Sequence, residues 1–241
     1  MQYEFPIFEG LCPSWGGVLH LASRQVFPKG SLILDMESPA QGVFFIKEGQ
    51  VDTALYTLNG PEKVLYCVGQ GCVFGEASCF STGTTGEASV WARSACTLYF
   101  FRKDTVEGVI AREHPHLLLE MAGLLGHIVR MYGVWLQDSL SQDYFVRVCR
   151  ILVYFVRWKL GDPQPRNRQV LIHSDITQSD VAKLLGVHRV TVTKAVKGLK
   201  DRGIIRRFTK TELDIADFQG LCRLGGFQPD ASTLASLTLR G

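Results

Sequence analysis

The sequence of 241 residues lacks any apolar run of about 18 residues, the length that a helix needs to cross a membrane. Its start, MQYEFPIFEG, has an acidic residue where a secretory signal peptide has basic ones. It also lacks a P-loop and a nucleophile elbow. These absences predict a cytoplasmic protein that has no membrane segment and is not an enzyme.

The cysteine pattern excludes the common disulfide and metal frameworks. The chain has seven cysteines, and no two of them have C-x-x-C spacing. An odd number without that spacing argues against a disulfide framework, a zinc ribbon and an iron-sulfur cluster. We expect reduced, buried thiols. A thiol switch at Cys67, Cys72 or Cys79 stays open, although no adjacent basic residue indicates one.

The stretch 175–207 predicts two helices that are joined by a glycine turn. Ser179 can cap the first helix, and Gly186 supplies the turn that ends it. A second helix over 189–202 has apolar residues at helical spacing. The inward-facing residues are Val181, Ala182, Leu184 and Leu185 in the first helix and Val192, Val196 and Leu199 in the second. This order is the helix-turn-helix pattern of DNA-binding proteins.

Positive charge is concentrated in the same stretch. Between residues 175 and 210 there are nine Lys or Arg and three Asp, a net charge of +6, whereas the whole chain carries +3. A concentrated basic patch is what binding to nucleic-acid phosphates requires. The tract GIIRRFTKTELDI then predicts a two-stranded hairpin, which would make a winged helix-turn-helix. The alternative is a solvated pair of amphipathic helices with no partner.

The amino-terminal part has a different pattern. Between residues 24 and 102, short apolar stretches are separated by glycine turns about every 8–12 residues, which is typical of an antiparallel sandwich or barrel. A helix follows over 113–140. It carries one heptad stripe of Leu117, Met121, Leu124, Ile128, Met131 and Trp135 and a second stripe of Leu118, Leu125, Val129, Tyr132 and Leu136. Two stripes imply two partners, a sister helix and the sandwich of the same chain. We assign the first stripe to the dimer interface.

The phrases FPKGS, FFIKEG and VGQGCVFGEAS, followed by the long helix and the helix-turn-helix, resemble the CRP/FNR superfamily of bacterial transcription regulators over about residues 20–220. The resemblance implies an α+β fold. Its parts would be an antiparallel β-roll of the cyclic-nucleotide-binding, jelly-roll type (1–110), a dimerisation helix (111–140), a winged helix-turn-helix (141–225) and a flexible tail (226–241). The implied partners are a double-stranded DNA operator, a second copy of the chain, a small-molecule effector and, for an activator, RNA polymerase.

The effector site implied by the resemblance lies between the β-roll and the long helix. Gly75, Glu76 and Ser78 match the start of the family's phosphate-binding cassette, but Gly86 or Glu87 stands where the phosphate-pairing arginine is expected. An acid there would repel a cyclic phosphate, so we expect neither cAMP nor cGMP. The candidate effector residues are Tyr66, Gly75, Glu76, Ser78, Trp91, His127 and Tyr132.

The phrases KVLYCVGQG and GVHRVTVTK are most similar to the CprK-type halorespiration regulators, which sense halogenated phenols. The resemblance therefore implies an aromatic or halogenated phenol or acid as effector, with His127 facing it. His127 also has an ordinary interpretation as a core histidine of the helix. Tyr66, Trp91 and Tyr132 are likewise either pocket residues or simple core.

The resemblance places the base-reading residues at the start of the second helix of the pair. The candidates are His188, Arg189, Val190, Thr191, Thr193, Lys194 and Lys197. Val190 replaces an acid that accepts a hydrogen bond from cytosine in the cyclic-AMP receptor pattern, and valine instead packs against a thymine methyl group. We therefore expect an A·T-rich inverted repeat as the operator.

Three other interpretations stay open. A redox- or haem-dependent gas sensor of the same superfamily is less consistent with the sequence, because only Cys12 lies in the first sixty residues and residues 75–77 include no Cys or His. A cupin-like metalloenzyme would need His114, His116 and His127, which lie on the predicted helix without a completing Glu. A DNA-binding protein without effector is the third. We expect no metal and no cofactor, although haem held by another residue stays open.

Overall fold

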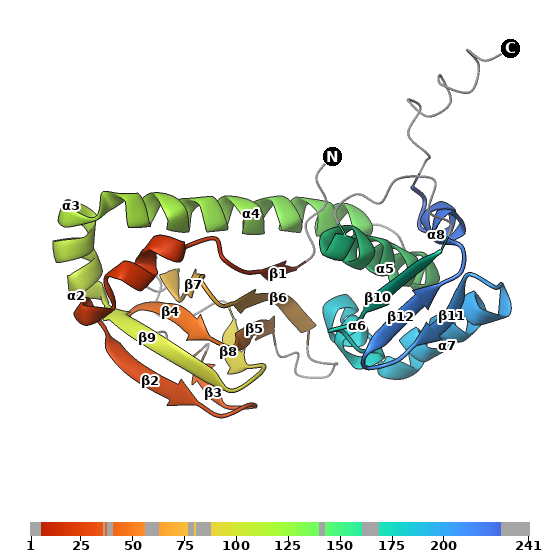
Figure 1. Ribbon diagram of the computed structural model, residues 1–241, viewed down its shortest axis with the longest axis horizontal. Coiled ribbons are helices and arrows are strands. Elements are labelled where there is room, and N and C mark those ends of the chain that lie inside the picture. Colours follow the sequence, from red (N-terminus) through yellow and green to blue (C-terminus); the bar gives the residue numbers. More distant parts are fainter. Residues whose placement is uncertain are drawn as a thin grey trace, which may run out of the picture. The chain divides into compact units, whose positions relative to one another are not determined.

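The computed structural model of the chain describes residues 6–35, 37, 41–55, 63–76, 80, 88–139, 143–160 and 169–227, without the side chains of residues 134 and 137–139 (Figure 1). These residues belong to two compact units, Pro6–Val134 and a second unit from Trp135 onward. Among the described residues, no helix combines the length and apolar character needed to span a membrane.

Two β-sheets make up the β-roll of the first unit. The strands of one sheet are, in spatial order, β1 (Ile7–Phe8), β6 (Lys63–Gly69), β5 (Gln50–Leu55), β8 (Ser89–Ala92) and β3 (Leu32–Leu34). Those of the other are β2 (Ser23–Phe27), β9 (Cys96–Arg102), β4 (Gly42–Glu48) and β7 (Val73–Phe74). The pairs are antiparallel except for β1 on β6. The predicted α+β fold with an antiparallel β-roll is confirmed.

The register of the five-stranded sheet separates its residues into two faces, because residues directly opposite one another on paired strands share a face. One row runs Leu34, Val90, Thr53, Tyr66 across β3, β8, β5 and β6. The neighbouring row runs Leu32, Trp91, Asp52, Cys67 across the same strands. We call the face of the first row the inner face, since Tyr66 meets Tyr132 of the long helix there.

Short helices lie between β1 and β2 and between β9 and the long helix α4 (Pro115–Ser139). They are the 3₁₀ turns η1 (Pro13–Gly17) and η2 (Leu19–Leu21), α2 (Lys103–Thr105), the π-helical turn η3 (Val106–Ile110) and α3 (Ala111–Glu113). Trp15 of η1 is fully buried, lies edge-on to Phe101 with ring centroids 5.1 Å apart, and donates its indole N–H to the Leu117 carbonyl at 3.1 Å. The indole thus fastens the amino-terminal turn and the start of α4 to the β-roll core.

The stripe of α4 that was assigned to the dimer interface is buried within the single chain, and the second stripe is exposed. In the stripe assigned to the dimer interface, Leu117, Met121, Leu124, Ile128 and Met131 are 0%, 5%, 1%, 7% and 0% exposed within the single chain. They are core residues and offer nothing to a sister helix, so that assignment is wrong for them; Trp135 is partly exposed. The second stripe is the open one, with Leu125 36%, Val129 69%, Tyr132 39% and Leu136 67% exposed. Together with Leu118 and Ala122, these residues keep the 4, 3, 4, 3, 4 spacing of a heptad seam.

The second unit is a three-stranded sheet with helices (Figure 1). Its elements are α5 (Tyr144–Leu160), β10 (Val170–His173), α6 (Gln178–Leu185), α7 (Arg189–Asp201), β11 (Ile205–Phe208), β12 (Glu212–Ile215) and α8 (Phe218–Leu224), with strand order β10-β12-β11. The predicted helix pair and the hairpin β11–β12 are confirmed. Strand β10 was not predicted.

The described cysteines are free, and Cys222 alone among them is partly exposed. Burial raises the pKa of the Cys12 thiol to about 12 and that of Cys72 to about 11, and it raises the pKa of Cys67 as well. Because the thiolate is the reactive form, these buried thiols are poorly suited to a redox switch at neutral pH. Cys79, Ser78 and residues 228–241 of the predicted tail lie outside the described residues.

Candidate functional site

Helix α6 is fixed by hydrogen bonds at its start and by a glycine at its end. Thr177 Oγ1 accepts from the Asp180 N–H at 3.2 Å, and the Asp180 carboxylate accepts from the Thr177 N–H at 2.7 Å, which is a capping box. The predicted cap, Ser179, lies inside the first turn, so that prediction is wrong. Gly186 ends the helix at φ +66°, as predicted, because a left-handed residue favours glycine.

Helix α7 turns one face into the core and the other to solvent. The buried residues are Val192, Ala195, Val196 and Leu199. On the other side, five of the seven predicted DNA-binding residues, Arg189, Val190, Thr193, Lys194 and Lys197, line one open cavity of about 340 Å³. We call these five residues the α7 face. Of the other two, His188 is exposed at the cap position, whereas Thr191 is partly buried.

One residue of this surface, Gln178, was not predicted from the sequence. Gln178, the first residue of α6, accepts a hydrogen bond at its Oε1 from Thr193 Oγ1 at 3.0 Å. This bond ties the start of α6 to the α7 face and fixes the rotamer of Thr193. A polar residue at the start of the first helix was the only available signal.

The positive charge of the second unit is focused on α7 and not on the hairpin. Arg206 pairs with Asp214 at 3.3 Å and Arg207 with Glu212 at 3.4 Å, so acidic residues beyond position 210 offset the hairpin's arginines. By contrast, Arg189, Lys194 and Lys197 form no ion pair with any residue that the structure describes. The three cations of the α7 face therefore keep their charge for an external anion.

The predicted effector residues are only partly brought together. Tyr66 and Tyr132 meet edge to face, with ring centroids 6.4 Å apart. Trp91 lies in the row of Asp52, on the opposite face of the sheet from Tyr66, so the two rings cannot line one site and the prediction for Trp91 is wrong. His127 is partly buried and precedes Tyr132 by five residues, which places it about 140° round the helix from that tyrosine.

Two buried oxygen atoms of the β-roll have no hydrogen-bond partner among the described residues, Oε2 of Glu76 and Oγ1 of Thr53. The two residues are 7% and 6% exposed. An unpaired buried polar group lowers the folding stability by about 1–3 kcal/mol. Such groups are therefore rare, and each calls for a specific explanation. Burial raises the pKa of the Glu76 carboxyl, because desolvation disfavours its charged form.

Gly75 places Glu76 beside the inner face. A Cβ on Gly75, whose φ is +87°, would lie 3.1 Å from the Gly42 carbonyl oxygen, 3.5 Å from Leu34 Cδ1 and 3.7 Å from Phe44 Cδ2. The chain therefore passes between the two sheets at this point. Arg93 does not serve this face, because it pairs with Asp52 at 3.1 Å and Asp52 belongs to the opposite face of the sheet.

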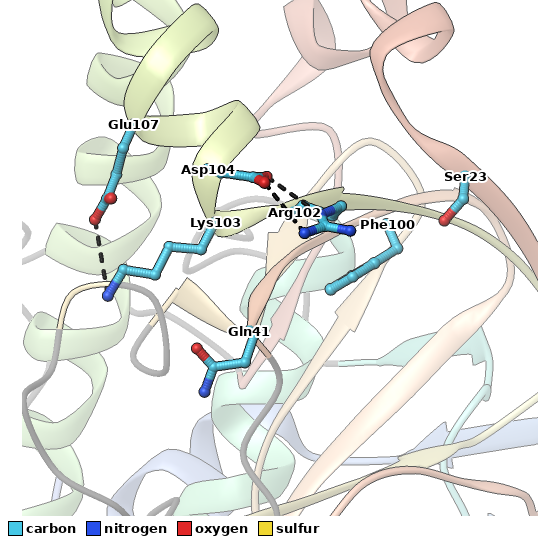
Figure 2. A pocket seen from close by; sticks show the side chains of 7 residues that line it. All are labelled: Ser23, Gln41, Phe100, Arg102, Lys103, Asp104 and Glu107. Atoms are coloured by element: carbon cyan, nitrogen blue, oxygen red, sulfur yellow. Dashed lines mark hydrogen bonds and ion pairs between the residues drawn. The ribbon is translucent and has the colours of Figure 1, made fainter.

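A separate cavity of about 630 Å³ lies where β9 meets α2 (Figure 2). Its lining residues are Ser23, Gln41, Phe100, Arg102, Lys103, Asp104 and Glu107. The four charges form two ion pairs, Arg102 with Asp104 at 3.1 Å and Lys103 with Glu107 at 3.7 Å (Figure 2). None of the predicted effector residues lines it, and its charges offset one another. Within the described residues, no group of three or more His, Cys, Asp or Glu is placed to hold a metal ion.

Comparison with known proteins agrees with both units. A cyclic nucleotide-binding domain matches residues 24–113, and a Crp-like helix-turn-helix domain matches residues 146–224. The chain belongs to the CRP/FNR family of DNA-binding transcription regulators. As a CRP/FNR regulator, it carries an effector-binding domain in front of its DNA-binding domain.

The chain is similar to curated CRP/FNR regulators over most of its length. It is 26% identical to the cyclic AMP receptor protein of Thermus thermophilus over 83% of this chain and 88% of that protein. It is 27% identical to the CRP-like cAMP-activated global transcriptional regulator of Mycobacterium tuberculosis over 90% of this chain and 95% of that protein.

Solved structures share the fold. A cysteine-to-serine variant of CprK in complex with OCPA has a TM-score of 0.75 at 19% identity, over 91% of this chain and 97% of that chain. A CooA variant from Carboxydothermus hydrogenoformans has a TM-score of 0.73 at 22% identity, over 87% and 90% of the two chains. At these identities the likeness establishes a common fold and says nothing about the effector of this chain.

Proposed function

We propose that this CRP/FNR regulator acts in the cytoplasm as a homodimer that binds an A·T-rich inverted repeat. A small molecule other than a cyclic nucleotide, bound between the β-roll and α4, changes its affinity for that operator. The observation that carries the DNA-binding part is the α7 face, where five predicted contact residues share one exposed surface. The position of the operator relative to a promoter then decides whether RNA polymerase is recruited or blocked.

The α7 face supplies the chemistry for both kinds of DNA contact. Val190 is 62% exposed, so its methyl groups are available to pack against a thymine methyl group in the major groove. Arg189 and Lys194 can donate to guanine acceptors or to phosphates, and Lys197, one turn further on, to the backbone. Thr193, held by Gln178, is positioned at the same surface.

The open stripe of α4 supports a homodimer. Its residues have heptad spacing and are exposed in the single chain, so a second α4 can cover them in a parallel coiled coil. A two-fold axis of this kind sets two α7 helices on an inverted repeat, with half-sites about 34 Å apart. Effector binding next to α4 would then shift the population of dimers in which the two α7 helices have that separation.

The effector differs in kind from the cyclic AMP that the names of the two curated relatives specify. No arginine stands in the cassette, and Glu76 is buried without a cation among the causes of its raised pKa. The inner face instead offers the edge-to-face pair Tyr66 and Tyr132. An aromatic ligand such as a halogenated phenol fits that surface.

Substitution Lys194→Ala tests the DNA contact. Fluorescence anisotropy with a selected operator should show weaker binding and a shallower dependence of log K on log salt, by about 0.9 for each phosphate that the variant no longer neutralises. Lys29→Ala, an exposed lysine of the β-roll, is the matched control and should leave both unchanged. Full operator affinity of Lys194→Ala with an unchanged salt slope would refute the assignment of this face.

A further inference from the structure

We propose that the effector is an uncharged organic molecule with a hydrogen-bonding group at each end, and that it bridges Thr53 and Glu76 on the inner face of the β-roll. The inference rests on the effector site proposed above and names the class of molecule that this site takes. It therefore also names the classes that the site rejects, which are phosphates and carboxylates.

The positions of the two residues follow from the strand register. Leu34 is opposite Val90, and Val90 is opposite Thr53, so Thr53 lies two strands from Leu34, or about 10 Å. Gly75 approaches the Leu34 side chain, which places the next residue, Glu76, at that end of the row. A ligand of about two fused rings in length therefore reaches from one polar group to the other.

Both groups can serve an uncharged ligand. The Thr53 hydroxyl donates and accepts, and Glu76 in its carboxylic acid form does the same. Desolvation raises the pKa of Glu76 and so favours that form. Both side chains are more than nine-tenths buried, and both oxygens lack a partner among the described residues, so a ligand would supply hydrogen bonds that those residues do not.

The buried polar or charged residues of the β-roll that the structure describes are Thr53, Glu76 and Ser89, and none of them is a cation that could pair with an anionic ligand. Residues 75–90 include no Lys, Arg or His. The buried α4 residues from Leu117 to Met131 are apolar, His127 is partly buried, and Arg93 is bound to Asp52 on the other face of the sheet. A phosphate or carboxylate would lose its hydration there without gaining an opposite charge. An aromatic body, in contrast, would meet Tyr66 and Tyr132 at the far end of the row.

Matched ligand pairs test the proposal on the full chain at pH 7. The probes are 6-hydroxy-2-naphthoate with its amide, 4-hydroxyphenylacetate with its amide, and cAMP with adenosine, each at millimolar concentration in a thermal-shift assay followed by calorimetry. We expect an uncharged member to raise the unfolding temperature and to bind at least tenfold more tightly than its charged counterpart.

Variants then tie that binding to the two groups. Thr53→Val and Glu76→Leu should weaken binding of the uncharged probe at least tenfold. Glu76→Gln, whose amide resembles the protonated acid, should bind that probe as tightly as the wild type does. Thr97→Val on β9, a threonine bonded to Glu48 at an exposed position, is the control. If Thr53→Val or Glu76→Leu fails to fold, retention in Glu76→Gln and binding by the wild type still decide the question.

The proposal is overturned if charged members bind as tightly as their counterparts, or if no uncharged member binds the wild type. Operator binding without probe, measured on the same preparation, reports on the proposed function separately. A chain that binds its operator but prefers anions keeps the function and loses this inference, whereas a chain that binds no duplex loses the function itself.

Discussion

Substitution Val129→Asp should convert the proposed dimer to monomers. Val129 is 69% exposed in the single chain and sits at the centre of the open stripe of α4. Full burial of a valine stabilises by about 1.5–3 kcal/mol, so covering this remaining area in two copies stabilises the dimer by about 2–4 kcal/mol. Two carboxylates facing each other across the axis cost several kcal/mol more. Together these effects should raise the dimer Kd by at least about 1,000-fold.

Sedimentation velocity at micromolar protein measures this directly, and Leu119→Asp provides the matched control. Leu119 is 74% exposed on the same helix but lies outside the stripe, so its substitution should leave the dimer intact. The reasoning is refuted if Val129→Asp remains dimeric, or if Leu119→Asp dissociates the dimer equally well. Circular dichroism of both variants should be that of the wild type, because neither side chain belongs to the core.

Two further predictions concern stability. In the folded state the pKa of Glu76 is raised above its ordinary 4.5, so the folded chain holds this proton more tightly than the unfolded chain. The free energy of unfolding should therefore fall as pH rises from about 4.5 through the raised value, and Glu76→Gln should remove that fall; identical urea titrations across pH for both chains would contradict it. Thr177→Ala removes the cap of α6 and should cost about 1 kcal/mol in urea unfolding, whereas Ser179→Ala should cost far less. Equal losses in these two variants would contradict the cap assignment.

The sequence predicted the elements whose signals are local. The turn at Gly186 and the hairpin after α7 depend on residues close together in the chain, and both are present as predicted. The cap was placed at Ser179 because serine is a good capping residue, but the actual cap, Thr177, also has Asp180 three residues later. The spacing of Thr177 and Asp180 is visible in the sequence, and it favours Thr177 over Ser179 as the cap.

What the sequence could not decide depended on partners distant in the chain. Both stripes of α4 have heptad spacing, and spacing alone does not tell which of them the β-roll covers. Trp91 and Tyr66 were grouped as aromatic residues, but the faces of a strand are set by its register, and a shift of one residue exchanges them. Strand β10 has only four residues, and its pairing with β12 joins segments about forty positions apart.

Selection of binding sites from random duplex DNA by the full chain tests the central claim most directly. We predict enrichment of an inverted repeat with half-sites about one helical turn apart and A·T pairs at the position that Val190 reads. The variant Val190→Glu should change that position to C·G, because a carboxylate accepts a hydrogen bond from cytosine N4. Absence of any enriched repeat, or the same preference in both proteins, would contradict the assignment of α7 as the helix that reads DNA.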